Sequence, residues 1–134
     1  MALPTGLKVV RIHNQATGSK DLNDEYVVIL NDGNQKWDLA GWLVTDDTDQ
    51  QIRPHEYRFP RLLAAGGTWT FDPGEAIFLN TGTGNETFIA QPATGRPQFH
   101  FYWGRSSFVW NNSGDRVFLR HPDGRWATEP FPVP

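Results

Sequence analysis

The feature that most constrains the fold of this chain is the regular interruption of its apolar segments by glycine and proline. The chain contains 13 Gly and 10 Pro among 134 residues. No window of about 11 residues keeps an apolar repeat of helical period without one of them. Between the interruptions lie about eight or nine short segments rich in β-branched and aromatic residues, a pattern typical of an all-β sandwich or barrel. The sequence therefore predicts a single all-β domain.

The expected strands alternate with polar turns along nearly the whole chain. The strongest is residues 25–31, which is apolar on both faces and is therefore expected to be central in its sheet or covered on both sides. Others are expected at residues 7–13, 42–44, 57–59, 75–79, 99–103, 117–119 and 125–127. Residues 80–96 are interpreted as a long loop because they carry Gly82, Gly84, Pro92 and Gly95. Residues 1–6 form an N-terminal lead, and the Pro-rich residues 128–134 are expected to be extended or frayed.

Composition excludes several classes of protein. The net charge of −3 disfavours a general binder of nucleic acid, which would carry a strongly basic balance. The absence of cysteine excludes disulfides and Cys-based zinc sites. No apolar run approaches the roughly 18 residues of a membrane helix, so no membrane insertion is expected. The N-terminus lacks the features of a signal peptide, yet a domain excised from an exported or cell-surface protein would look the same, so the compartment stays open.

Tryptophan is expected to dominate the core. Trp42 follows Gly41, which permits a tight turn into the sandwich, and Trp110 precedes a polar corner at residues 111–115. Both rings are predicted to point inward and to bury large apolar areas. Asp115 is expected to accept hydrogen bonds from backbone N–H groups of that corner.

The order of several short motifs resembles the lamin-tail domain family, in its bacterial type. The motifs are Glu25-Tyr26-Val27, Asn31, Leu39-Ala40-Gly41-Trp42, Tyr57-Arg58-Phe59-Pro60, Pro73-Gly74, Trp110-Asn111-Asn112-Ser113-Gly114-Asp115 and Asp123-Gly124. The resemblance covers residues 7–127 and implies an immunoglobulin-like β-sandwich. Two departures matter: residues 61–72 are longer than the family's usual link, and no coiled-coil rod precedes the domain. Lamin-type filament assembly is therefore not implied.

The resemblance implies a non-catalytic interaction or targeting module without cofactors, which recognises a protein or cell-surface partner through loops and edge strands. An accessory domain of an exported hydrolase or nuclease is an alternative, because the family often occurs beside such enzymes. A carbohydrate-binding module is another alternative, with Trp69 and Trp103 as the best candidates for exposed rings. Open sheet edges would also permit a homodimer.

Several residue groups carry side chains suited to a binding or catalytic site, and a structural interpretation is preferred for each. Asp46-Asp47-Thr48-Asp49 offers oxygens to Ca²⁺ but lacks the Gly and the terminal Glu of a calcium-binding helix-loop-helix, so a solvated loop is preferred. Zinc binding is disfavoured because no ligand pair shares a short spacing among His13, His55, His100 and His121. No nucleophile-elbow context surrounds Ser106, Ser107 or Ser113.

Three further patterns carry a weaker signal. The segment Asn80-Thr81-Gly82-Thr83-Gly84 looks like a phosphate loop but lacks the Lys-Ser/Thr ending. Glycosylation acceptors occur at Asn85 and Asn111. A basic patch that binds phosphate or nucleic acid would require five arginines to lie close together: Arg53, Arg58, Arg61, Arg96 and Arg105. Charge dispersed over the surface is the preferred interpretation.

Overall fold

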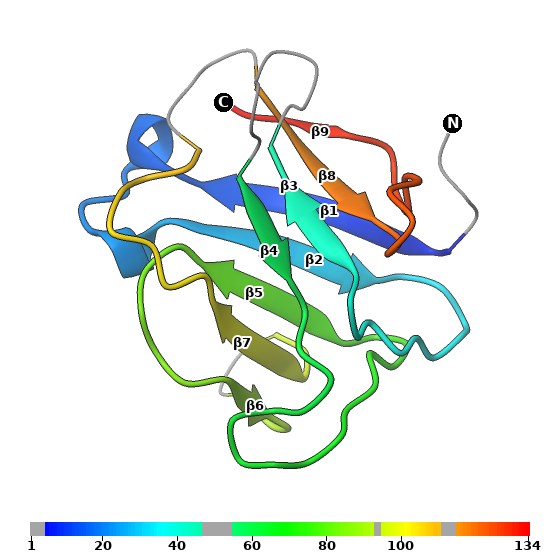
Figure 1. The fold of residues 1–134 in the computed structure, drawn as a ribbon. Coiled ribbons are helices and arrows are strands. Elements are labelled where there is room, and N and C mark those ends of the chain that lie inside the picture. The colour runs from blue at the N-terminus through cyan, green and yellow to red at the C-terminus, as the bar shows by residue number, and fades with distance from the viewer. Residues whose placement is uncertain (1–4, 47–54, 93–94, 111–114) are drawn as a thin grey trace.

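The computed structural model describes residues 5–46, 55–92, 95–110 and 115–134. Two β-sheets are stacked on one another (Figure 1). The first sheet has the order β1-β2-β5-β7-β6, formed by β1 (Leu7–His13), β2 (Tyr26–Asn31), β5 (Ala76–Asn80), β7 (Gln98–Tyr102) and β6 (Thr87–Ile89). The second has the order β4-β3-β8-β9, formed by β4 (Glu56–Arg58), β3 (Leu43–Thr45), β8 (Arg116–Arg120) and β9 (Phe131–Pro132).

All strand pairs are antiparallel except β5 and β7, which run parallel. The only helical elements in the described residues are two single 3₁₀ turns, η1 (Gln15–Thr17) and η2 (Leu22–Asp24). The prediction of an all-β, immunoglobulin-like sandwich of about eight or nine short strands is confirmed, because the described residues form strands β1 to β9. The central position of β2 is also confirmed, because it lies between β1 and β5.

Three local predictions need correction or refinement. The loop predicted at residues 80–96 contains β6, because Thr87, Phe88 and Ile89 favour extended backbone and pair with β7. The strand predicted at residues 125–127 is reduced to one bridge between Arg120 and Trp126. Of the two states considered for the tail, the extended one is observed, since β9 pairs with β8.

The core lies between the sheets and is built around aromatic rings. Trp42 and Trp110 are buried, as predicted, and Trp110 is completely excluded from solvent. The rings of Trp103 and Trp110 form a T-shaped pair with centroids 5.9 Å apart, an arrangement that aromatic pairs favour. Trp103 is only partly exposed and packs against this core.

The prediction that Trp69 is exposed is wrong. Its side chain is 7% exposed, and its indole nitrogen donates a hydrogen bond of 2.9 Å to the backbone oxygen of Pro60. The ring lies 5.1 Å from Phe99 and 4.9 Å from Phe101, centroid to centroid. The long link at residues 61–72 folds back on itself through a bridge between Leu62 and Thr68, and this turn directs the indole into the core. A carbohydrate platform built on Trp69 is therefore excluded.

A completely buried carboxylate joins segments that are distant in sequence. Oε1 of Glu25 accepts hydrogen bonds from Oγ1 of Thr81 at 2.7 Å and from the backbone nitrogen of Val109 at 2.8 Å, with Trp110 N at 3.4 Å. The backbone oxygen of Trp110 accepts in turn from the side chain of Asn14 at 2.6 Å. Buried backbone groups need such partners, so Glu25 fixes the entry to the corner that follows Trp110.

Candidate functional site

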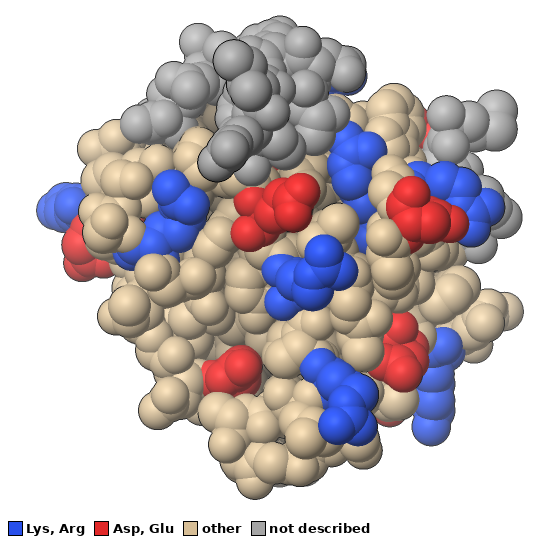
Figure 2. Space-filling view, viewed as in Figure 1, with Lys and Arg blue, Asp and Glu red and all other residues tan. Residues whose placement is uncertain are grey.

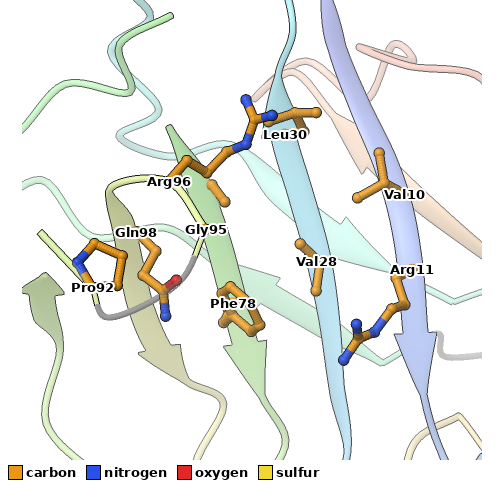
Figure 3. Close-up of a pocket in the computed structure, with 10 residues that line it drawn as sticks. Val10, Arg11, Val28, Leu30, Phe78, Pro92, Gly95, Arg96 and Gln98 are labelled. Carbon is orange, nitrogen blue, oxygen red and sulfur yellow. The ribbon is translucent and has the colours of Figure 1, made fainter. Parts of the chain in front are cut away.

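The outward-facing side of the first sheet carries a hollow of about 540 Å³ (Figure 3). Side chains alternate between the two faces of a strand, so this face receives the residues of β2 that do not enter the core. The hollow, here called the outer-face hollow, is lined by Val10, Arg11, Val28, Leu30, Ala76, Phe78, Pro92, Gly95, Arg96 and Gln98. The solvent-facing side of a sandwich sheet is usually polar, so the apolar residues in this lining are unusual and make the surface a candidate site.

An irregularity in β1 brings two consecutive residues to the hollow. The register with β2 shifts between Val9, which pairs with Ile29, and Arg11, which pairs with Val28. A β-bulge of this kind places one extra residue in the strand. As a result the consecutive residues Val10 and Arg11 are both exposed, and Figure 3 shows both directed toward β2.

The floor of the hollow is apolar. Val28 and Leu30 of β2 lie beside Phe78 of β5, and Val10 of β1 is 42% exposed at the margin. The Phe78 ring stacks on the imidazole of His100, with centroids 4.9 Å apart and an angle of 18° between the planes. These contacts hold the Phe78 ring against the sheet and leave the space above the floor open.

Two arginines mark the ends of the hollow. The Arg11 guanidinium donates a hydrogen bond to the hydroxyl of Tyr26 and lies 5.3 Å from the centre of that ring. Nη1 of Arg96 donates to the backbone oxygen of Gly74 at 3.3 Å. Figure 3 shows the two guanidinium groups apart, Arg96 toward Leu30 and Arg11 beyond Val28. None of the lining residues is a carboxylate.

His100 lies at the border of this surface, where burial favours the neutral form of its imidazole. Burial lowers the pKa of its imidazole below the ordinary value, because the charged form is poorly solvated there. Its Nε2 lies 2.7 Å from the side-chain nitrogen of Gln98, which donates a hydrogen bond to it. This pair fixes the Gln98 amide at the edge of the hollow.

The lowered pKa of His100 predicts a pH-dependent contribution to stability. The unfolded chain binds a proton near the ordinary value of 6.5, whereas the folded chain binds it at lower pH. The stability of the domain should therefore fall as the pH drops below about 6.5, and this part of the fall should stop below the folded pKa. Urea unfolding of wild type and His100→Asn at several pH values measures it. A stability difference between the two proteins that stays constant from about pH 7.5 to 5 would contradict the assignment.

The structure does not bring the candidate arginines together. Arg58 lies on β4 of the second sheet and donates to the backbone oxygen of Gly41 at 3.1 Å, and Arg61 follows that strand. Arg96 lies at the outer-face hollow, while Arg105 lines a separate hollow with Lys20 and Ser106. Arg53 is outside the described residues. Figure 2 shows acidic and basic side chains interspersed on the visible face, which agrees with the preferred interpretation of dispersed charge.

The candidate metal ligands have structural partners instead. Asp46 is buried and accepts a hydrogen bond of 2.8 Å from the backbone of His55, whose Nδ1 lies 2.5 Å from the same carboxylate. Nδ1 of His13 lies 2.6 Å from the backbone oxygen of Asp24, and the His121 ring packs on Trp42 at 4.3 Å. Asp47, Thr48 and Asp49 lie outside the described residues. In the part of the chain that is described, no group of three or more acidic or His residues could hold a metal ion.

The remaining candidates take up positions without a shared chemistry. Within the suggested phosphate loop, Thr81 bonds Glu25 and the Asn80 side chain donates to the backbone oxygen of Asn23 at 2.8 Å. Ser106, Ser107 and Asn85 are exposed. Ser113 and Asn111 lie outside the described residues, as does most of the corner at residues 111–115. Oδ1 of Asp115, the last residue of that corner, accepts a hydrogen bond of 2.9 Å from the backbone nitrogen of Arg116.

The outer-face hollow was not predicted from the sequence. The signal that could have indicated it is the apolar character of both faces of residues 25–31, since only one of those faces enters the core. The bulge at Val10 and the arrival of Arg96 beside β2 depend on contacts between distant segments, which no local pattern reveals.

The comparison with protein families agrees with this architecture. The chain matches the model of the Lamin Tail Domain over residues 4–129 and belongs to that family. The family has an immunoglobulin-like fold, is generally non-catalytic and is of the protein-interaction type. None of the curated proteins matches the chain. Among the residues described, no helix is both long enough and apolar enough to cross a membrane.

Proposed function

We propose that this domain is a non-catalytic interaction module that recognises a protein partner through the outer-face hollow. The observation that carries the proposal is an apolar floor on the solvent side of a sheet, bounded by Arg11 and Arg96 and lined by no carboxylate. Contiguous apolar surface rimmed by polar groups marks interaction sites on soluble proteins. The interaction-type character of the family supports this assignment.

The chemistry around the hollow supports binding without turnover. General acid–base or nucleophilic catalysis needs a nucleophile or a pair of titratable groups that face the same space. The lining residues offer two guanidinium groups and one amide, and the neighbouring His100 already contacts Gln98. These groups can position an anion and an apolar side chain, and they supply no proton acceptor for a reaction.

The edge strands offer a second surface, for a partner or for a second copy of the chain. All three residues of β6 are exposed, and Phe88 and Ile89 present apolar side chains at the border of the first sheet. An open edge can pair with another strand through its backbone. Recognition through this edge would be blocked by Ile89→Lys and would be unaffected by a charge placed at Val10.

Selection from a random peptide library displayed on phage tests the outer-face assignment. Wild-type domain is the bait, and each enriched peptide is then measured against Val10→Asp and the matched control Leu62→Asp. The two positions have similar exposure, 42% and 39%, and Leu62 lies in the link after β4. We expect Val10→Asp to weaken binding at least about tenfold, because it places a charge over the apolar floor. Binding that resists Val10→Asp, or that is lost only in Leu62→Asp, would contradict the proposal.

A further inference from the structure

We infer that the outer-face hollow accepts an extended peptide segment with two acidic residues four positions apart and an apolar residue midway between them. The inference rests on the proposed function and specifies the chemistry of the partner. It follows from three properties of the hollow: the separation of its two guanidinium groups, the apolar floor between them and the charge of the surroundings.

The separation of the cations sets the spacing of the acids. Arg11 reaches the Tyr26 end of β2, whereas Arg96 reaches Gly74, whose backbone nitrogen bonds the oxygen of Asn31 at the other end of that strand. At about 3.3 Å per residue, the four to five residues between these ends span roughly 13–17 Å. In an extended peptide, side chains four positions apart are separated by about 13 Å and point to the same face. Glutamates at that spacing can therefore reach both guanidinium groups.

The apolar floor determines the residue between the acids. Val28 and Leu30 lie between the two ends of the hollow, with Phe78 beside them on β5. In an extended segment the residue two positions after the first acid faces the same way as both acids. A leucine, isoleucine or phenylalanine at this middle position would cover the floor, and burying such a side chain is favourable.

The charges around the hollow favour carboxylates. In the described residues, neither Arg11 nor Arg96 has a carboxylate within ion-pair distance. The carboxylate that acts on this surface is Asp32, which accepts a hydrogen bond of 2.9 Å from Nζ of Lys8. Lys8 is the main cause of the lowered pKa of Asp32, and the charge of Arg96 makes a smaller contribution in the same direction. Each guanidinium group uses part of its donor set on Tyr26 or Gly74 and keeps further N–H groups that can donate to a carboxylate.

A peptide fits these features better than a polyanion does. Nucleic acids and anionic membranes require a continuous row of cations, whereas this face offers two cations separated by apolar residues. The net charge of −3 opposes long-range attraction of polyanions. A peptide with only two negative charges experiences little of that repulsion. Each of its acids lies beside one arginine, and its apolar residue covers the floor.

Fluorescence anisotropy of a dye-labelled heptapeptide tests the inference. The peptide is capped and carries glutamates at its second and sixth positions, leucine at the fourth and threonine or serine elsewhere. Wild-type domain is compared with Arg11→Gln, Arg96→Gln and the matched control Arg58→Gln, which lies on the second sheet. Because the ion pairs are exposed, we expect each of the first two substitutions to weaken binding about two- to fivefold, and the control to leave it unchanged. Binding should also weaken as salt is raised.

Peptide variants give the test its specificity. Replacing both glutamates by glutamine should abolish the salt dependence and the effect of the arginine substitutions. Moving the second glutamate to the fifth position directs it to the opposite face and should weaken binding to the level of the singly charged peptide. No saturable binding up to about 1 mM domain, or equal binding of the glutamine peptide, overturns the inference. Tighter binding of single-stranded DNA or phosphatidylserine vesicles in the same assay would overturn it as well.

The outcome separates this inference from the proposed function. If the library yields peptides of another composition whose binding is lost in Val10→Asp, the outer-face assignment holds and the acidic spacing is wrong. If no peptide depends on Val10, both fail. If the designed heptapeptide binds and both arginine substitutions weaken it, both are supported.

Discussion

Replacing Trp42 by alanine is expected to lower the free energy of unfolding by about 3–5 kcal/mol, the usual cost of deleting a large buried ring. Trp42 is 6% exposed and packs between Trp37 and His121, with ring centroids 5.6 Å and 4.3 Å away. Its backbone also extends the pairing of β3 with β4, since its oxygen accepts a hydrogen bond of 2.9 Å from the backbone nitrogen of Phe59.

Urea unfolding followed by far-ultraviolet circular dichroism measures this loss. Trp126→Ala is the matched control, because Trp126 is only partly buried and packs on the single ring of Phe118. We expect the control to lose less than half as much stability. Equal losses in the two variants would show that Trp42 is not a main support of the core. Since domains are stable by about 5–15 kcal/mol, a loss of this size moves the urea midpoint of Trp42→Ala well below that of the wild type.

Replacing Glu25 by alanine is expected to lower the free energy of unfolding by about 3–5 kcal/mol, because several buried hydrogen-bond donors lose the carboxylate that accepts from them. The substitution would leave Thr81 Oγ1 and the backbone nitrogens of Val109 and Trp110 without their shared partner. These donors lie in segments that are otherwise far from Glu25 in the chain. We therefore expect the entry to the polar corner to loosen before the rest of the sandwich unfolds.

Glu25→Gln separates hydrogen bonding from the loss of the side chain. The glutamine keeps an oxygen at the position of Oε1 and places an amide where Oε2 has no hydrogen-bond partner in the described structure. The loss in free energy of unfolding should be clearly smaller for Glu25→Gln than for Glu25→Ala. Glu56→Ala, on the exposed side of β4, is the control and should be nearly neutral. Amide hydrogen exchange at Val109 and Trp110 provides the local measurement, and unchanged exchange in Glu25→Ala would contradict the assigned role.

The features predicted correctly from the sequence are those encoded locally. The apolar segment that forms β2 and the turn at Gly41 before Trp42 depend on neighbouring residues, so periodicity and turn chemistry identify them. Gly41 adopts a φ of 81°, a backbone conformation that glycine tolerates and other residues resist. The identity of the fold followed from the order of such local motifs.

The features missed or predicted wrongly depend on contacts between distant segments. Trp69 was expected at the surface, yet Phe99 and Phe101 of β7 cover it, and no pattern near Trp69 indicates this. Glu25 was read as the first residue of a strand, although its carboxylate bonds the backbone of Val109. The candidate site also depends on distant segments, because Arg11 and Arg96 line the same hollow only when the first sheet has formed.

The central claim is that recognition takes place on the outer face of the first sheet, and methyl NMR of the domain bound to a selected peptide tests it most directly. The account predicts that the methyl signals of Val10, Val28 and Leu30 shift on binding. Those of Val27 and Ile29, which point into the core from the same strand, should shift little, and Leu62 should not shift. Shifts confined to Ile89 would place recognition at the β6 edge, and shifts centred on Leu62 would place it in the link after β4. Either result would contradict the account.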